Sequence, residues 1–161
     1  MQDIQSIINK LQLLPHVEGG YYRETYRSEQ LHQTSGGPLR SLSTLIYFLL
    51  PSGRYSKFHK IASDELWLYH LGAPVAIHQL LNDGTLQTDI LGSDIEEGQQ
   101  LQVLIPAGTL FGAEVLGVDT FALSACMVSP GFDFADFNLY NKEVLLEMFP
   151  QQAEVIERLH Q

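Results

Sequence analysis

The segment spanning residues 53–72, GRYSKFHKIASDELWLYHLG, constrains the fold more than any other part of the chain. Successive side chains of a β-strand point to opposite faces, so residues two apart share a face. A short turn at residues 62–64 then allows a second strand to return along the first. The side chains that this arrangement directs to one interior are His59, Ile61, Glu65, Trp67 and Tyr69. The segment therefore predicts a β-hairpin whose inner face forms a polar pocket with aromatic walls.

Short apolar or alternating runs, separated by turn residues, fill most of residues 43–129. Outside the 53–72 segment these runs are STLIYFLLP, PVAIHQLL, LQTDILG, QLQVLIP, TLFGAEVLG and DTFALSACMVS. The second and third of them flank residues 82–85, NDGT, whose Asp-Gly pair is a strong hairpin signal. Strands at such short intervals, about eight or nine in all and without alternating helices, predict an all-β sandwich or barrel.

The N-terminal residues predict a helix over residues 1–14. Asp3 is a suitable cap, and Pro15 cannot continue the helix. The residues at the spacing of one helical face are Ile4, Ile7, Ile8 and Leu11. We therefore expect this helix to pack against the body of the domain.

The C-terminal residues predict a helical tail over about residues 141–160. Asn141 suits the cap of one short helix, and Pro150 suits the first turn of a second. The apolar positions of the two helices are Val144, Leu145, Met148, Val155, Ile156 and Leu159. A chain of 161 residues with 45% apolar content supports one domain over residues 1–161, with its β portion over about residues 20–130.

The segment PHVEGGYYRETYRSEQ combines two glycines with a strand-like alternation over residues 21–27. One face of this strand would carry Tyr21, Arg23, Thr25 and Arg27, and the other Tyr22, Glu24 and Tyr26. Which face lines the pocket stays open at this point. Glu18, Arg23 and Glu24 either form a structural ion-pair cluster or bring Arg23 or Glu18 to the mouth of the pocket.

Two further segments differ from this strand pattern. Residues 31–40, LHQTSGGPLR, are polar and rich in Gly and Pro, which predicts an exposed loop or a mobile cover over a site. Residues 130–140, PGFDFADFNLY, carry four aromatic side chains, and we expect these to pack in the core or in an interface.

The charge and cysteine content exclude several classes of partner. Nine Lys and Arg against nineteen Asp and Glu give a formal charge of -10, which repels nucleic acid and acidic membrane surfaces. The single cysteine, Cys126, lies in an apolar run and cannot form an internal disulfide. No run of 18 apolar residues and no signal-peptide pattern is present. We expect a cytoplasmic protein that binds neither nucleic acid nor membranes.

The spacing of Gly53, His59, Glu65 and Gly72 resembles the first cupin motif, with Ile61 where that motif has a second histidine. Pro106-Ala107-Gly108 resembles part of the second motif, with Phe111 where its histidine stands. Four blocks in order resemble the uncharacterised cupin-5 family: PHVEGGYYRETYRS, FHKIASDELW, PAGTLFGAEV and SPGFDFADF. The resemblance implies a double-stranded β-helix, the RmlC-like cupin jelly-roll barrel, in a homodimer. It implies no established activity.

The same resemblance raises the question of a metal. The usual cupin site has three histidines and one glutamate, and a catalytic metal generally needs three protein ligands. Only His59 and Glu65 remain here, and His78 or a tyrosine is the weak alternative for a third ligand. We therefore expect no cofactor, and a divalent metal is disfavoured.

Without a metal, His59 and Glu65 suggest acid–base chemistry, because a carboxylate beside an imidazole orients it and favours its charged form. In this hypothesis His59 is the acid/base, Glu65 its orienting partner, and Tyr69 or Tyr47 the second proton donor. The reaction would be an isomerisation, epimerisation or elimination on a small carbohydrate-like or carboxylate compound. Metal-free cupins that act on sugar nucleotides resemble this arrangement, although they also need cations to hold a diphosphate. The cations near the proposed site are Arg23, Arg27, Arg40, Arg54, Lys57 and Lys60.

Two alternatives remain open. The pocket can belong to a non-catalytic module that binds or senses a small molecule, with Trp67, Tyr69 and Phe111 as stacking surfaces. His59 and Glu65 can also be a hydrogen-bonded remnant of an ancestral metal site, since a fold does not imply a function. A metal-dependent cupin enzyme is the least favoured hypothesis. The expected partners are a small-molecule ligand and a second copy of the chain.

Overall fold

The structure is a computed structural model, and it describes residues 3–161. Its helices are α1 (Ile4–Leu11), α2 (Lys142–Met148) and α3 (Ala153–Leu159), with two 3-10 turns, η1 (Phe134–Asp136) and η2 (Pro150–Gln152). Its strands are β1 (Leu14–Pro15), β2 (Tyr21–Arg27), β3 (Leu31–Gln33), β4 (Leu39–Ser41), β5 (Thr44–Pro51), β6 (Tyr55–Lys60), β7 (Asp64–Gly72), β8 (Val75–Leu80), β9 (Leu86–Leu91), β10 (Gln102–Ile105), β11 (Leu110–Val115), β12 (Phe121–Ser129) and β13 (Asn138–Leu139).

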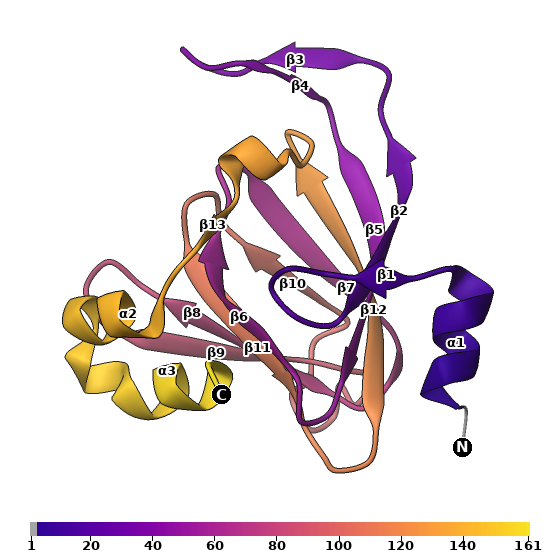
Figure 1. Cartoon of the computed structure of the whole chain (residues 1–161), viewed down its shortest axis with the longest axis vertical. Coiled ribbons are helices and arrows are strands. Elements are labelled where there is room, and N and C mark those ends of the chain that lie inside the picture. The colour runs from indigo at the N-terminus through magenta and orange to yellow at the C-terminus, as the bar shows by residue number, and fades with distance from the viewer. Residues whose placement is uncertain (1–2) are drawn as a thin grey trace.

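Two antiparallel sheets form the body of the protein (Figure 1). One has six strands in the order β1-β2-β5-β12-β7-β10, and the other has five in the order β13-β6-β11-β8-β9. A buried cluster joins them, with Phe48 and Trp67 from the first sheet and Ile77 and Phe111 from the second. Apolar side chains facing inward from both sheets bury the area that stabilises such a sandwich. The all-β class with short terminal helices is confirmed.

The predicted hairpin over residues 53–72 is wrong in its pairing. β6 and β7 do not pair with each other: β6 pairs with β11 and β13, and β7 pairs with β12 and β10. The chain crosses from one sheet to the other at residues 61–63. The inner faces of the two strands therefore meet across the interior, and His59 and Glu65 approach from opposite sheets. The hairpin predicted at residues 82–85 is confirmed, since β8 pairs with β9 on either side of it.

The helices cover the outer faces of the sheets (Figure 1). α1 packs its apolar residues on Leu49 and Leu123 of the six-stranded sheet, and α2 and α3 pack on Phe58 and Leu110 of the five-stranded sheet. The buried residues of the tail are Leu145, Phe149, Val155, Ile156 and Leu159, whereas Val144 and Met148 are exposed. Within residues 3–161, none of the helices has the length and apolar character needed to cross a membrane.

The ends of α1 follow from its sequence. The side chain of Asp3 accepts hydrogen bonds from the backbone nitrogens of Gln5 and Ser6, both at 3.2 Å, which confirms the predicted cap. Gln12 adopts a left-handed conformation with φ of 55°, so the helix ends at Leu11. The chain is extended again at β1, within the range of 1–14 predicted as helix, and residues 1 and 2 lie outside the described part of the chain.

The prediction of a loop over residues 31–40 is also wrong. β3 and β4 form a two-stranded antiparallel hairpin with Leu31 opposite Ser41. Figure 1 shows this hairpin projecting beyond the edge of the two sheets. A Thr34–Pro38 turn closes it, because the hydroxyl of Thr34 donates to the carbonyl of Pro38 at 2.8 Å.

A β-bulge in β2 decides which of its side chains face the interior. The register against β5 shifts between Glu24 and Tyr26, so one residue, Thr25, lies outside the regular pairing. The strict alternation expected for residues 21–27 therefore fails at this point. Glu24 and Arg27, which simple alternation places on opposite faces, both reach the interior.

The segment before β2 is closely packed at Gly19. Its φ is 123°, and a Cβ there would collide with the backbone carbonyl of Tyr55. We expect Gly19→Ala to lower the free energy of unfolding by roughly 2–5 kcal/mol, because strain and overpacking add. Gly53→Ala is the matched control, since Gly53 also has a positive φ, 75°, but faces open space. The control should lose only about 1 kcal/mol in urea denaturation, and equal losses would contradict this packing argument.

Candidate functional site

A cavity of about 490 Å³ lies between the two sheets. This volume is within the range of small-molecule binding sites. Its polar and charged side chains are His16, Glu18, Glu24, Arg27, Thr44, His59, Glu65 and Asp133. Its aromatic side chains are Tyr22, Phe48, Phe132, Phe134 and Phe137. Of the candidate residues predicted from the sequence, His59, Glu65 and Glu18 line this cavity.

His59 and Glu18 form a buried pair in the cavity wall. The His59 side chain is 2% exposed and its Nε2 lies 3.2 Å from Oε2 of Glu18. Its Nδ1 lies 2.7 Å from the carbonyl oxygen of Lys57, which can only accept, so Nδ1 carries a proton. A neutral ring then has a lone pair on Nε2, and that lone pair would face a carboxylate oxygen. The contact is a hydrogen bond only when a proton lies between Nε2 and Oε2.

The sequence suggested Glu65 as the carboxylate that orients His59, but in the structure this carboxylate is Glu18. The reason is the separation of β6 and β7 into opposite sheets, which directs Glu65 to other partners. Ser56, three residues before His59 on β6, donates its hydroxyl to Oε1 of Glu18 at 2.8 Å. Both oxygens of this buried carboxylate thus have a partner, which a buried charge requires.

Glu65 is in an environment that keeps it uncharged. Burial is the main cause that raises its pKa from the ordinary 4.5 to about 8, and the nearby negative charge of Glu18 raises it further. Hydrogen bonds from the indole of Trp67, at 2.9 Å, and from the thiol of Cys126 oppose the shift. Burial is also the main cause that raises the pKa of Cys126, so this thiol stays protonated. At neutral pH Glu65 is mostly a carboxylic acid facing the cavity.

His16 is a cavity residue that the sequence analysis missed. Its Nδ1 lies 3.3 Å from the backbone nitrogen of Glu18 and 3.4 Å from Oε2 of Glu18. Burial lowers its pKa, and Glu18 opposes this shift. Four aromatic rings surround it, those of Tyr22, Phe48, Phe134 and Phe137, with centroid distances between 4.6 and 6.2 Å. No periodicity in the sequence marks it, because residues 16–19 form a turn in which the backbone nitrogen of Gly19 donates to the carbonyl of His16 at 3.2 Å.

An aromatic segment after β12 forms another wall of the cavity. Phe132, Phe134 and Phe137 line it, and the ring of Phe137 lies 5.2 Å from that of His59. Phe132 and Phe134 pack edge to face with centroids 4.9 Å apart. The aromatic rings of this segment therefore pack against one another, as expected, and also face the cavity.

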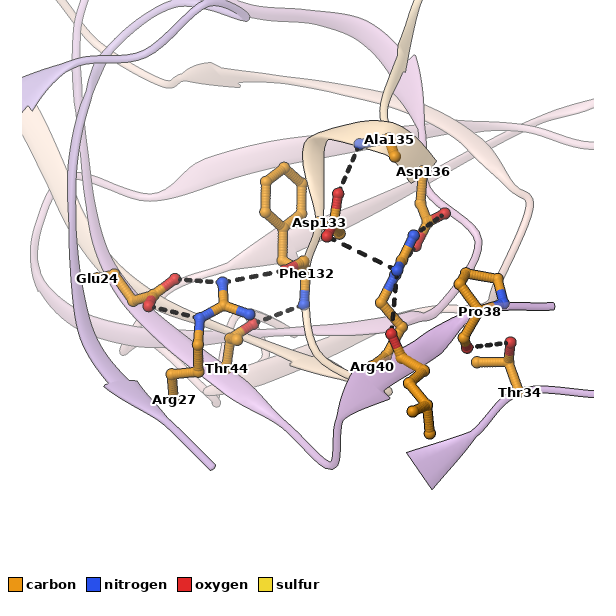
Figure 2. A network of polar contacts seen from close by, with 11 residues as sticks. Glu24, Arg27, Thr34, Pro38, Arg40, Thr44, Phe132, Asp133, Ala135 and Asp136 are labelled. Carbon is orange, nitrogen blue, oxygen red and sulfur yellow. Dashed lines mark hydrogen bonds and ion pairs between the residues drawn. The ribbon is translucent and has the colours of Figure 1, made fainter. Parts of the chain in front are cut away.

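Two arginines hold this segment in place (Figure 2). Arg27 of β2 binds both carboxylate oxygens of Glu24, at 2.9 and 2.8 Å, and donates to the carbonyl of Phe132 at 3.0 Å. Arg40 of β4 binds both oxygens of Asp136, at 2.7 and 2.9 Å, and this hydrogen bonding lowers the pKa of Asp136. Bidentate pairs of this kind fix geometry as well as charge. Arg27 lines the cavity, whereas Arg40 does not.

Several predicted site residues lie outside the cavity lining. Tyr69 donates its hydroxyl to the carbonyl of Gly72 at 2.7 Å, and Tyr47 packs on the outer face of its sheet beneath α1. Arg23 also points outward, since its guanidinium donates to Gln12 at 3.3 Å. None of these three side chains is placed to act on a molecule in the cavity.

Trp67 and Phe111 lie in the buried core next to the cavity and support its polar residues. Both are at most 1% exposed, so neither offers a stacking surface. Trp67 donates to Glu65, and the ring of Phe111 lies 4.2 Å from that of His59. Their contribution is to position the two groups that they contact.

The residues present do not fit a cupin metal site. The two ring nitrogens of His78 contact Thr88 at 2.9 Å and Glu114 at 3.0 Å, away from the cavity. His59, Glu65 and His78 therefore do not converge on one site. Ile61 and Phe111 are buried where the other ligands would stand. In the described part of the chain, residues 3–161, no three His, Cys, Asp or Glu side chains are grouped to hold a metal ion. The expectation of no cofactor stays a prediction.

Strands that alternate between two facing sheets, around a cavity with a histidine and a glutamate, define a cupin-type jelly roll. The sequence profile described as "Cupin superfamily (DUF985)" matches residues 5–140. The chain belongs to this family.

Relatives in other organisms cover nearly the whole chain. A protein of Saccharomyces cerevisiae, the uncharacterized protein YML079W, is 32% identical over 154 residues, which is 87% of this chain and 76% of that protein. The crystal structure of protein SO0799 from Shewanella oneidensis has a TM-score of 0.92 and 43% identity, covering 100% of this chain and 99% of that one. A hypothetical protein from Leishmania major also has a TM-score of 0.92, with 35% identity and 98% of each chain covered.

A more distant likeness concerns the fold alone. Oxalate decarboxylase from Bacillus subtilis is 16% identical with a TM-score of 0.57, covering 90% of this chain and 36% of that chain. This likeness confirms the cupin fold and carries no conclusion about activity.

The raised pKa of Glu65 predicts a pH-dependent stability. The pKa of Glu65 is about 8 in the folded protein, above the ordinary value of 4.5 expected in the unfolded chain. As the pH rises between these values, the carboxyl group ionises in the unfolded chain but not in the folded protein, so the free energy of unfolding falls. Glu65→Gln keeps an acceptor for Trp67 and cannot ionise. We expect the variant to gain stability relative to the wild type from pH 5 to pH 9, by an amount on the order of several kcal/mol. Denaturant unfolding at each pH measures the difference.

The matched control is Glu96→Gln, at an exposed position. The difference between this control and the wild type should not follow the same pH course. A difference between Glu65→Gln and the wild type that stays constant across the range would contradict an uncharged Glu65.

Proposed function

We propose that this protein is a metal-independent acid–base enzyme that isomerises, epimerises or eliminates a small polar compound bound in the cavity. The observation that carries the proposal is the buried pair of His59 and Glu18, whose Nε2 and Oε2 lie 3.2 Å apart at the cavity wall. A proton held by two groups that face a ligand-sized cavity is available for transfer.

The chemistry needs only movement of a proton. A base removes the hydrogen beside a carbonyl group, and the electron pair of the broken C–H bond forms a double bond while negative charge develops on the carbonyl oxygen. Return of a proton to the same carbon, on its other face, inverts it. Return to the former carbonyl carbon isomerises a hydroxy carbonyl compound, with the hydroxyl proton of the first carbon passing to the former carbonyl oxygen. In an elimination the C–O bond on the next carbon breaks instead, and the leaving oxygen takes the proton. The His59–Glu18 pair is the base once its shared proton has passed to solvent: it then takes the hydrogen from carbon and gives it back in the second step. No oxidant or reductant enters this balance.

Glu65 takes the place that the sequence analysis gave to Tyr69 or Tyr47. With a pKa of about 8 it is a proton donor at neutral pH, and it faces the cavity from the sheet opposite His59. Two acid–base groups whose environments differ, one paired with a charge and one uncharged, are the usual arrangement of a proton-transfer site.

A non-catalytic binding or sensing module is the second candidate. The five aromatic rings of the lining favour it, because aromatic surfaces bind small molecules without any reaction. In this case the stacking surfaces are Phe132, Phe134 and Phe137 rather than Trp67 and Phe111.

We also propose that two copies of the chain associate. Four apolar side chains at matching register positions form a row across the outer face of the six-stranded sheet: Leu104, Leu66, Met127 and Leu45. α1 packs on a different part of this face, and Leu104 is 51% exposed. Leu45, Leu66 and Met127 are half-buried. An apolar row that reaches the surface in this way is typical of an association surface, and the two-fold pairing of identical chains is the commonest kind.

The test of catalysis follows hydrogen exchange. Ligands are first found by thermal-shift screening of sugars, hydroxy acids and oxo acids, and each is then incubated with the protein in D2O. We expect deuterium to enter a C–H position of the ligand. His59→Asn should lower this rate roughly 10²–10⁴-fold while affinity stays close to that of the wild type. His32→Asn, at an exposed position of β3, is the matched control and should exchange at the wild-type rate.

The two candidates give different results in this experiment. A ligand that binds the wild type and is recovered without deuterium after long incubation would overturn the catalytic proposal and support the binding module.

The association surface has its own test. Leu104→Glu places a charge in the apolar row and should shift the molar mass measured by light scattering from two chains to one. Val118→Glu is the control, because Val118 is 90% exposed and lies outside the row. A wild-type protein with the mass of a single chain would overturn the proposed pairing.

A further inference from the structure

The charged groups that line the cavity are already paired with one another. Glu24 binds Arg27 at 2.8 Å, Glu18 binds His59 at 3.2 Å, and Asp133 lies 3.7 Å from Arg40. Glu65 is mostly uncharged near neutral pH. Among residues 3–161, the cavity lining therefore offers no cation that lacks a carboxylate partner.

This pairing disfavours an anionic ligand. A phosphate or carboxylate group is usually bound by Arg or Lys side chains with free donors. In this cavity it would have to compete with Glu24 for Arg27 or with Glu18 for His59, and loss of either contact leaves a carboxylate without its partner. Two other cations, Arg54 and Lys57, do not line this cavity but an adjoining hollow of about 450 Å³, which shares His16 and Glu18 with it.

The imidazole of His16 carries a hydrogen-bond donor that faces the cavity without a partner. The backbone N–H of Glu18 has a proton to donate in every state, so Nδ1 of His16 accepts it at 3.3 Å. The proton of the neutral ring is then on Nε2. Nε2 makes no hydrogen bond to any described residue, and no fully buried side-chain nitrogen or oxygen of those residues lacks a partner. Nε2 therefore keeps accessible surface, and the ring lines the cavity.

The donor is held close to the proposed acid–base pair. Oε2 of Glu18 lies 3.4 Å from Nδ1 of His16 and 3.2 Å from Nε2 of His59, so both rings flank one carboxylate oxygen. The ring of Phe137 contacts both imidazoles, with centroid distances of 6.1 and 5.2 Å. The four aromatic rings around His16 restrict its orientation, which sets the direction of the N–H in advance.

We infer that the cavity binds an uncharged carbonyl or polyhydroxy compound, one oxygen of which accepts a hydrogen bond from Nε2 of His16. This inference rests on the proposed function in taking the cavity as the ligand site. If the ligand is also the substrate, the N–H of His16 meets the negative charge that develops on the carbonyl oxygen, while the His59–Glu18 pair handles the proton on the adjacent carbon.

The first test compares uncharged compounds with their phosphate esters. The probes are D-glucose, D-fructose and dihydroxyacetone, each beside its own phosphate, with binding measured by ligand-observed NMR and calorimetry at physiological salt. We expect each detected uncharged compound to bind at least about tenfold more tightly than its ester. Tighter binding of the esters, or no binding of any uncharged probe at about 10 mM, would overturn the inference.

The second test separates the donor from the packing of the ring. His16→Asn keeps an acceptor near the position of Nδ1 and lacks a group at Nε2, whereas His16→Gln places an amide N–H near Nε2. We expect His16→Asn to weaken binding of the uncharged probe about tenfold and His16→Gln to stay within about threefold of the wild type. Equal losses in both variants would assign His16 a packing role only.

The outcomes also separate this inference from the proposed function. Preference for uncharged probes without deuterium exchange would support the ligand class and overturn the catalysis. Deuterium exchange into a phosphorylated ligand would support the catalysis and overturn the ligand class. If a His16 variant fails to fold, the comparison of probes with the wild type still decides the ligand class.

Discussion

Glu18 lies inside the protein with its two carboxylate oxygens divided between the hydroxyl of Ser56 and the imidazole of His59. A buried carboxylate is costly unless its oxygens have such partners, so the three side chains depend on one another. The turn before β2 makes the contact possible, because Gly19 passes so close to Tyr55 that no side chain fits there. The polar half of the cavity thus depends on a short segment without regular secondary structure.

The charge state of the rest of the cavity follows from this pair. The negative charge of Glu18 adds to burial in keeping Glu65 protonated, and burial also keeps His16 in its neutral form. Farther out, Arg27 binds Glu24 and also donates a hydrogen bond to the carbonyl of Phe132. The cavity therefore presents uncharged donors and aromatic surfaces rather than free charge.

Strand alternation was enough to predict which side chains of residues 53–72 face inward, and His59, Ile61 and Glu65 all line the cavity. It was not enough to predict pairing, because an arch between two sheets and a hairpin within one direct the same side chains inward. The bulge at Thr25 also escaped prediction, since a single extra residue leaves no mark on composition. His16 and Glu18 belong to a segment with no periodicity, where backbone conformation alone determines their direction. Tyr47 and Tyr69 were chosen by residue type, and their hydroxyls turned out to face away from the cavity.

The substitution of two metal ligands by Ile61 and Phe111 changes the electrostatics of the remaining two. A metal-bound glutamate is ionised, but Glu65 here is buried beside Trp67 and Cys126 in a place that favours its neutral form. His59 packs against the ring of Phe111 and the ring of Phe137, and its two ring nitrogens face the carboxylate of Glu18 and the carbonyl of Lys57. The two groups that remain of the usual ligand set are thus an uncharged acid and an imidazole paired with a carboxylate. Such a separation is the condition under which two neighbouring groups transfer protons in different directions at one pH.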